Sequence, residues 1–362
     1  MSNHFRDTTL GYVYKMKADG SEWRIIHTFS HSVPQMGAIT PTWGLVSDGV
    51  DSLLGITHGN KREGAYGTLY KINATTGVLT TLVQFSGKPD PHLGSFPCAG
   101  LATDGMGFYW GSTEAGGTND TGTVFKFHPA TGVLTTVAEF PASPDPRFRS
   151  LATRAALVSD GNGSWWGTTY RGGADQCGNI FKVDATTGEL MTVVEFIEGA
   201  GYVGPTLSLV SDGQGFLWGT CDGGWGGDGR LFKVNVFTGD LTTVVDFTDK
   251  GRGNSGHVPD SALVSDGHGF LWGCTYRGGS DDAGTLFKVD IASGALTTLV
   301  EFEEKQSRHK GYRPNAALVS GGHGAFLGTP SKGGKKNAGT IFKIDIATGV
   351  LTTLVELGKV GP

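Results

Sequence analysis

The stretch ALVSDGHGFLWGCTYRGGSDDAGTLFKVDIASGALTTLVEF, residues 262–302, contains the pattern on which the whole chain is built. It holds four short apolar runs rich in Val, Thr, Leu, Phe and Trp, and glycine-containing turns separate them. Such runs are typical of β-strands and are too short for helices. The predicted strands, named A to D in chain order, cover residues 262–265, 270–275, 285–290 and 296–302.

The third run begins with a Gly-x-(Leu/Val/Ile)-(Phe/Tyr)-Lys block that recurs along the chain at intervals of 51 to 56 residues. The seven copies end at Lys15, Lys71, Lys126, Lys182, Lys233, Lys288 and Lys343. A fixed period of this size indicates a repeat architecture, and four strands per period is typical of a β-propeller blade. We therefore predict an all-β, seven-bladed propeller of four-stranded antiparallel blades, forming one domain over residues 1–362.

The first repeat is incomplete. Strand A begins at six places, near Leu45, Leu101, Leu157, Leu209, Leu263 and Leu318. Residues 3–9, 11–17 and 23–29 would supply strands B, C and D of a seventh blade that has no strand A. Because an open sheet edge is a liability, we expect these N-terminal strands to close the propeller by pairing with the C-terminal end. The missing strand would be short or would come from the tail, residues 358–362.

Composition narrows the range of partners. The chain has 362 residues, a formal net charge of −5 and no run of Lys or Arg, so it lacks the basic surface that nucleic-acid binding needs. Its apolar runs are too short to span a membrane. The N-terminus has no apolar signal region, which predicts a cytoplasmic protein, or a secreted one if a leader was removed. We expect a monomer.

Several repeated residues have simple structural interpretations. Trp and Phe at fixed places in strands B and C should form the core, and the Asp of Ser-Asp-Gly should organise the A–B turn. Hairpin pairing predicts a charge pair between Lys288 and Glu301. The four cysteines lie in different repeats without metal-site spacing, so we expect small buried side chains. The alternative interpretation, a reactive thiol, remains open mainly for Cys98, which we place in a loop.

The string G-T-T-Y-x-G-G…G-T-(L/I)-F-K-x-D…T-G-x-L-T-T-L-V-x-F appears at residues 167–196 and 273–302, and more loosely in every other repeat. It resembles the GloVer tandem repeat of bacterial propeller-like proteins, a family whose activity is largely undefined. The resemblance covers nearly the whole chain and implies the propeller fold. The Asp-Gly-x-Gly-x-x-Trp-Gly segment is also similar to repeats of two-component-regulator propellers and streptogramin lyases. No catalytic residue of those lyases matches a position in this chain.

The repeats differ from one another in two of their four connections. The A–B and C–D turns are nearly uniform, whereas the B–C loops and the D–A crossovers vary in length and content. Function tends to be carried by variable loops on a rigid frame, so we predict the site on the face that these loops share, at the channel mouth. The first variable place of the B–C loop is occupied by His58, Glu114, Tyr170, Asp222, Tyr276 and Ser331.

This face contains the parts of an acid/base site. We predict His58 with Glu114, and His257 with Asp260, as catalytic pairs. The predicted substrate-binding residues are Trp43, Arg154, Tyr170, Arg171, Asp222, Trp225, Tyr276, Arg277 and Asn315. No cofactor is evident, although a divalent cation, Mg²⁺ or Ca²⁺, could bind through Glu114, Asp222 or Asp260.

Three functions remain open. The mouth residues differ from repeat to repeat, which favours one asymmetric site and therefore a small-molecule or carbohydrate-active enzyme, catalysing elimination, isomerisation or hydrolysis. The alternative is a glycan- or small-ligand-binding propeller without catalysis, because Tyr170-Arg171-Gly-Gly and Tyr276-Arg277-Gly-Gly are near-copies. The third is a protein-interaction scaffold, which would expose a larger apolar patch.

Overall fold

The computed structural model describes residues 9–30, 44–61, 64–86, 94–142, 153, 155–197, 203–205, 207–222, 229–247, 256–304 and 311–357. All of its named elements are β-strands. Within these ranges, no helix is long and apolar enough to cross a membrane. The described chain clusters into two compact units, one of residues 1–17, 21–157 and 183–191 and one of residues 18–20, 158–182 and 192–362.

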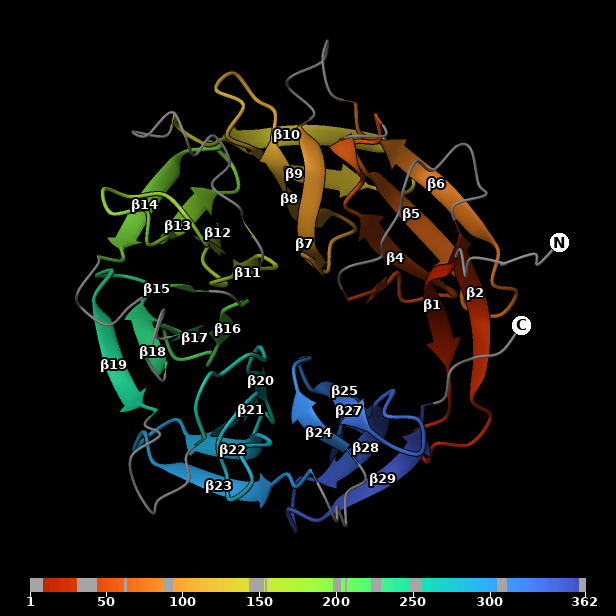
Figure 1. Ribbon diagram of the computed structural model, residues 1–362. Helices are drawn as coiled ribbons and strands as arrows, with labels where there is room; N and C mark the ends of the chain where they lie inside the picture. The colour runs from red at the N-terminus through yellow and green to blue at the C-terminus, as the bar shows by residue number, and fades with distance from the viewer. Residues whose placement is uncertain are drawn as a thin grey trace, which may run out of the picture. The chain divides into compact units, whose positions relative to one another are not determined.

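Six antiparallel sheets repeat the strand order A-B-C-D (Figure 1). Three begin in the first half of the chain: β3(Val46–Ser47), β4(Ser52–Thr57), β5(Thr68–Asn73), β6(Leu79–Gln84); β7(Ser95–Thr103), β8(Tyr109–Ala115), β9(Thr123–His128), β10(Val133–Glu139); and β11(Val158–Ser159), β12(Ser164–Thr169), β13(Asn179–Asp184), β14(Leu190–Glu195). Three follow: β15(Val203–Pro205), β16(Val210–Ser211), β17(Phe216–Asp222), β18(Arg230–Asn235), β19(Leu241–Asp246); β20(Val264–Ser265), β21(Phe270–Thr275), β22(Thr285–Asp290), β23(Leu296–Glu301); and β25(Val319–Gly322), β26(Ala325–Gly328), β28(Thr340–Asp345), β29(Leu351–Glu356).

The prediction of seven four-stranded blades is wrong, because the described residues contain six. The N-terminal strands β1(Thr9–Lys15) and β2(Arg24–Ser30) form a two-stranded sheet, and neither pairs with another described strand. The physical reason is the missing strand A of that repeat, which leaves too few strands for a full blade. Most of the predicted strand B, and the tail at 358–362, lie outside the described residues.

Strand A is more irregular than predicted. In the second sheet it is the single strand β7, which pairs with β8 at both ends and has an irregularity between Cys98 and Ala102. In the fourth sheet it is divided into β15 and β16, which both pair with β17. In the last sheet the first part, β24(Gly311–Pro314), pairs with β27(Pro330–Gly333). The first part of strand A therefore adjoins the B–C loop, where the predicted site lies.

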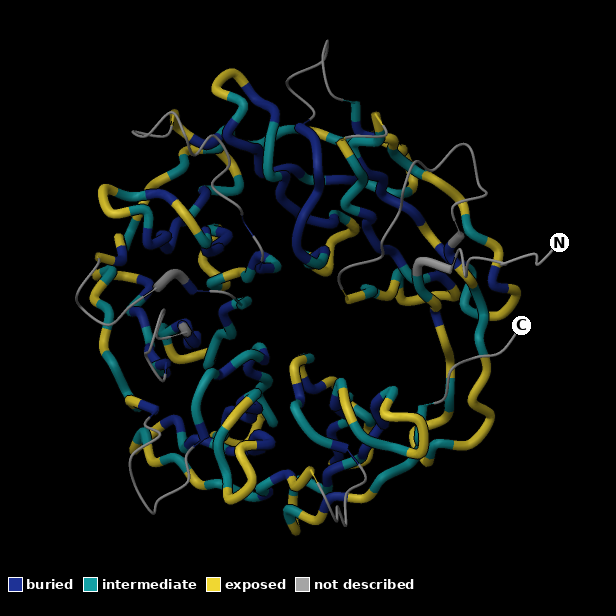
Figure 2. The backbone as a smooth tube through the Cα atoms, in the orientation of Figure 1, coloured by how far each residue is buried: buried dark blue, intermediate teal, exposed yellow. Residues whose placement is uncertain are grey.

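The predicted aromatic core is confirmed. Trp166, Trp218 and Trp272 of the B strands are fully buried, and so are Phe125, Phe232 and Phe287 of the C strands. In Figure 2 the B and C strands are mostly buried, while exposure is concentrated in the turns. Trp218 packs in one cluster with Phe287 of the following sheet, so these side chains join neighbouring sheets.

The Asp of the A–B turn has the predicted structural role. Asp212 Oδ1 accepts hydrogen bonds from the backbone N–H groups of Gln214 and Phe216, at 2.7 and 3.1 Å. Its Oδ2 accepts from Trp218 Nε1 at 2.9 Å. The same three bonds recur at Asp160 and Asp266. One carboxylate therefore closes the turn and fixes the core Trp.

The predicted pairing of Lys288 with Glu301 is wrong. The cross-strand partner of Lys288 is Thr297, and Glu301 lies opposite Thr285. The Lys288 ammonium instead lies 4.5 Å from the Phe270 ring centroid and 5.8 Å from that of Trp272. A bulge between residues 286 and 287 shifts the register. The lysine therefore contacts aromatic faces on strand B by cation–π interaction.

The C–D turns provide a prediction about acid stability. Backbone N–H groups of Thr187, Ser293 and Thr348 hydrogen-bond the exposed carboxylates of Asp184, Asp290 and Asp345, and this lowers the pKa of each below 3.8. A carboxylate whose pKa is lower in the folded state stabilises the fold above its unfolded pKa, and this contribution is lost as the pH falls below about 3.8. We expect the triple variant D184N/D290N/D345N to lose less stability between pH 6 and pH 3 than the wild type does.

The chain supplies the control for this variant. Asn73 and Asn235 hold the same place in two other repeats, and each Oδ1 accepts from two backbone N–H groups of its turn. The Asn substitutions should therefore preserve the hydrogen bonds of the turns and remove only the carboxyl groups whose protonation depends on pH. Urea midpoints at the two pH values measure the effect, and equal losses in variant and wild type would contradict it.

Candidate functional site

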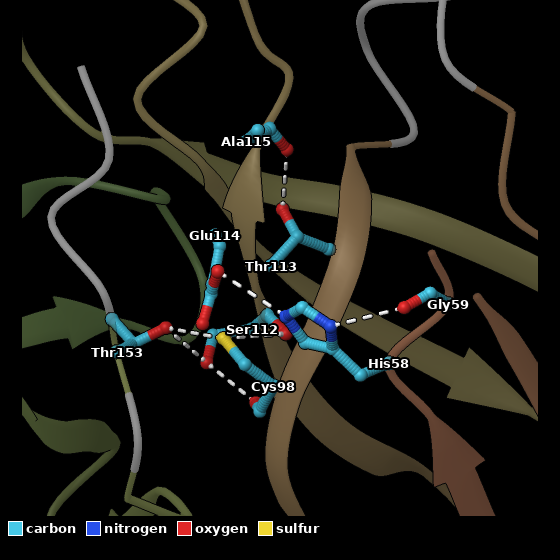
Figure 3. Close-up of polar contacts among 8 residues, drawn as sticks. All are labelled: His58, Gly59, Cys98, Ser112, Thr113, Glu114, Ala115 and Thr153. Atoms are coloured by element: carbon cyan, nitrogen blue, oxygen red, sulfur yellow. Dashed lines mark hydrogen bonds and ion pairs between the residues drawn. The ribbon is translucent and has the colours of Figure 1, made fainter. Parts of the chain in front are cut away.

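Two predicted catalytic side chains, His58 and Glu114, meet in the first unit (Figure 3). His58 directly follows β4, and Glu114 lies near the end of β8 in the next sheet. Their Nε2 and Oε2 atoms are 3.2 Å apart, and the side chains are 34% and 25% exposed. The two residues hold equivalent places in consecutive repeats, so the repeat itself brings them to one junction. The pair is accessible and yet partly shielded from water.

Acceptor atoms lie at both nitrogens of the His58 ring. Its Nδ1 atom is 3.3 Å from the carbonyl oxygen of Gly59, and its Nε2 faces the Glu114 carboxylate. The contact therefore places an imidazole nitrogen and a carboxylate oxygen within reach of each other, a combination of groups that general acid/base catalysis uses.

Aromatic side chains cover one side of the pair. The Phe96 ring lies 5.6 Å from that of His58 and 5.5 Å from that of Tyr66, measured between centroids. Phe96 has a φ of 56°, in the left-handed region, and this conformation lies in the irregular strand A. Such a φ is costly for a bulky residue and persists only where the surroundings hold it. The packing therefore restricts the orientation of His58.

A buried polar group lies beside Glu114 (Figure 3). The Cys98 thiol is 3.0 Å from Thr153 Oγ1, which donates to Ser112 Oγ at 2.9 Å. Ser112 Oγ in turn donates to the carbonyl of Cys98 at 3.4 Å. Thr153 holds the place that is proline in most repeats, namely Pro97, Pro205, Pro259 and Pro314. This junction therefore carries a polar network where its counterparts have a proline ring.

The placement of Cys98 in a loop is wrong, because Cys98 lies in β7 and is fully buried. All four cysteines are buried, as expected. Burial raises the pKa of the Cys274 thiol to about 12, which keeps that thiol protonated and unreactive.

A carboxylate lies beside His257, the histidine of the second predicted pair. The carboxylate beside His257 is that of Asp282, at 3.5 Å from Nε2, and the side chain of His257 is 12% exposed. Asp282 was not among the predicted residues. Its Oδ1 also accepts from the backbone N–H of Gly278, a bond that Asp120 and Asn337 repeat in other B–C loops. The recurrence of Asp or Asn at this place of the B–C loop is the sequence signal that could have identified Asp282. It also indicates that the main role of Asp282 is to stabilise the loop. Asp260 is half-buried.

The remaining predicted residues are dispersed. Tyr276 is half-buried, and the exposed Arg277 lies 3.9 Å from Asp282. Tyr170 is half-buried after β12, Arg171 beside it is exposed, and Asn315 is exposed after β24. Asp222 ends β17, but its side chain lies outside the described part of the chain. Trp43, Arg154 and Trp225 also lie outside it.

A groove of about 570 Å³ lies in the second unit, between two of its A–B turns. Asp266, His268, His323, Phe326 and Asp345 line it. The two carboxylates are already hydrogen-bonded within their own turns, and both histidines are exposed. It contains none of the predicted site residues. Across the described ranges, no three His, Cys, Asp or Glu side chains gather as a metal ion would require.

Solved structures share the fold at low sequence identity. A GH74 enzyme from Niastella koreensis has a TM-score of 0.63 and 14% identity over 96% of this chain and 52% of its own. A candidate 6-phosphogluconolactonase from Bacteroides fragilis has a TM-score of 0.59 and 19% identity over 98% and 93%. An oligogalacturonate lyase in complex with manganese has a TM-score of 0.55 and 14% identity over 84% and 74%. At such identities these similarities show a propeller fold alone.

The family comparison covers nearly the whole chain. None of the curated proteins compared with this chain matches it. The model of the Gloeobacter/Verrucomicrobia repeat matches residues 2–224, 94–257 and 155–361, which are overlapping copies of the repeat. The resemblance noted from the sequence is thereby confirmed, and the chain belongs to the Gloeobacter/Verrucomicrobia repeat family.

Proposed function

We propose that this chain is an enzyme in which His58 and Glu114 form one acid/base pair that acts on a small polar molecule or a carbohydrate. The observation that carries the proposal is the 3.2 Å contact between the half-buried side chains of His58 and Glu114. Asp282 accepts a backbone hydrogen bond that recurs in other B–C loops, and this bond explains why an acidic residue lies there. Glu114 does not make this bond, so a role in stabilising the loop does not explain its position.

Each residue has a role in this scheme. His58 transfers a proton to or from the substrate, because an imidazole changes its charge near neutral pH. Glu114 accepts the imidazole hydrogen bond and stabilises the charged form of the ring, as a carboxylate partner does in other acid/base sites. Elimination, isomerisation and hydrolysis all need such a transfer. In an isomerisation the proton returns to another atom of the substrate, in an elimination the acid protonates the leaving group, and in a hydrolysis the base takes a proton from the attacking water while the acid protonates the leaving group.

The structural comparison supports the carbohydrate class of substrate. The similar folds include an oligogalacturonate lyase and a GH74 enzyme, both named as carbohydrate-active enzymes. Because that lyase was determined with manganese, a divalent cation belongs among the conditions to test.

A substrate panel tests the proposal. Aryl glycosides, sugar lactones and oligouronides would each be incubated with the wild type and with the His58→Asn variant, with and without Mn²⁺ or Mg²⁺. We expect one class to be converted by the wild type at a rate at least about 100-fold above that of the variant, the usual contribution of a positioned proton donor. Product analysis by mass spectrometry distinguishes elimination from hydrolysis, since only hydrolysis adds water.

The same panel decides between catalysis and binding. A class that binds the wild type but is never converted would contradict the proposal in favour of a ligand-binding propeller. Conversion at equal rates by the wild type and H58N would show a catalytic site elsewhere in the chain.

A further inference from the structure

Arg313, in the second unit, occupies a place that carries an apolar side chain in two other repeats. It lies directly before Pro314, where Phe96 and Val258 precede Pro97 and Pro259. The three residues share the same left-handed backbone, with φ values of 58°, 56° and 55°. At this place Phe96 lies over His58 of the preceding repeat. The repeat therefore predicts that Arg313 lies over Tyr276, the counterpart of His58.

The structure has that arrangement. The guanidinium carbon of Arg313 is 5.5 Å from the Tyr276 ring centroid and 6.0 Å from that of Tyr312. The backbone is fixed as well, because Arg313 N–H donates to the carbonyl of Ala283 at 2.8 Å and Ser331 Oγ donates to the carbonyl of Arg313 at 2.9 Å. The guanidinium group is therefore held in place before any ligand arrives.

The charge of Arg313 is not neutralised within the described part of the chain. Its Nε atom is buried and has no hydrogen-bond partner, and no described carboxylate lies within ion-pair distance of its guanidinium group. A guanidinium has five N–H donors and cannot lose its charge. Burying such a donor without an acceptor costs free energy, so a fixed and unsatisfied guanidinium is prepared for an anionic acceptor.

The neighbouring charges do not remove this attraction. Asp282 interacts with His257 and Arg277, at 3.5 and 3.9 Å. The exposed Glu304 interacts with the Tyr312 hydroxyl group. Tyr312 also donates to Asn337 Oδ1 at 3.4 Å.

We propose that Arg313, flanked by Tyr276 and Tyr312, binds an oxyanion, either a carboxylate or a phosphate group carried by a small ligand. Because Nε is buried, the planar guanidinium presents its two Nη groups side by side to two oxygens of such a group, and the aromatic rings keep it oriented. This binding site is independent of the proposed acid/base pair and needs neither His58 nor Glu114.

The experiment is a calorimetric titration of the full chain at low ionic strength with three probes: inorganic phosphate, galacturonate and neutral galactose. The variants are Arg313→Gln, Arg313→Lys and the control Lys336→Gln, which removes one positive charge from an exposed position in the neighbouring loop. A charge-assisted hydrogen bond contributes about 1.5–3 kcal/mol, so R313Q should weaken binding of the anions by at least about tenfold. R313K should weaken it by less, because the charge remains but the side-by-side donors are lost.

The outcomes separate the two sources of the anion. Binding of galacturonate and not of phosphate would identify a carboxylate site, and the reverse would identify a phosphate site. Binding of both, lost in R313Q and kept in K336Q, would support a general oxyanion site. The proposal is overturned if neither anion binds the wild type, if galactose binds equally well, or if R313Q and K336Q weaken binding alike.

Discussion

Replacing Glu114 with Gln should lower kcat/KM for the substrate that the panel identifies by about 100- to 1000-fold. Gln keeps the size of the side chain and one acceptor oxygen, but it carries no negative charge and cannot accept or donate a proton as a carboxyl group does. General acid/base residues typically contribute factors of this size to the rate. Steady-state kinetics with purified E114Q measures the effect, and circular dichroism verifies that the variant is folded.

The double variant makes this prediction specific. If His58 and Glu114 act as one unit, H58N/E114Q should be little slower than either single variant, because groups that act together show non-additive losses. The control is His268→Asn in an A–B turn of the second unit, an exposed place that is Asn162 in another repeat. If the rate losses of H58N and E114Q multiply in the double variant, the two residues do not act as a catalytic pair. A loss in H268N equal to that in E114Q would argue against the pair as well.

Replacing Trp218 with Ala should destabilise the second unit by about 3–5 kcal/mol, the usual cost of deleting a large aromatic side chain from a core. Trp218 is fully buried and packs with Phe287 of the neighbouring sheet. The substitution also removes the Nε1 hydrogen bond to Asp212, which leaves that carboxylate oxygen without its donor. Urea denaturation followed by tryptophan fluorescence measures the loss.

The control for this prediction comes from the repeats. Leu54 and Leu327 hold the place of Trp218 in two other sheets. Trp218→Leu should therefore cost about half as much as Trp218→Ala, because Leu refills part of the volume. A loss below about 1 kcal/mol in W218A would mean that Trp218 does not join the sheets as the burial indicates.

The repeated residues of this chain were sufficient to predict most of its secondary structure. The B, C and D strands could be assigned because their apolar runs and glycine turns recur at a nearly constant interval, so each repeat checks the others. The buried Trp and Phe and the turn-closing Asp followed from the same recurrence. The number of full blades could not be predicted, because a strand exists only if a partner is present, and the N-terminal repeat has no strand A.

Side-chain partners were harder to predict for a local reason. The hairpin register places Thr285 opposite Glu301, and an extra residue in strand D at Leu299 shifts it further, so Lys288 lies opposite Thr297 and contacts aromatic rings. The carboxylate beside His257 comes from the middle of a B–C loop, where a left-handed Asp282 turns the chain back. Backbone irregularities of this kind leave little trace in apolar periodicity.

For the candidate site, the variable B–C places pointed to His58 and Glu114, and their equivalent places in consecutive repeats indicated that the two side chains could meet. The 3.2 Å distance and the Thr153 network depend on how two sheets pack, which no local pattern encodes. Residue types and spacing therefore established the repeat, the core and the face that varies. Long-range packing established that His58 meets Glu114 and that Arg313 lies over Tyr276, because those contacts join residues that lie tens of positions apart in the chain.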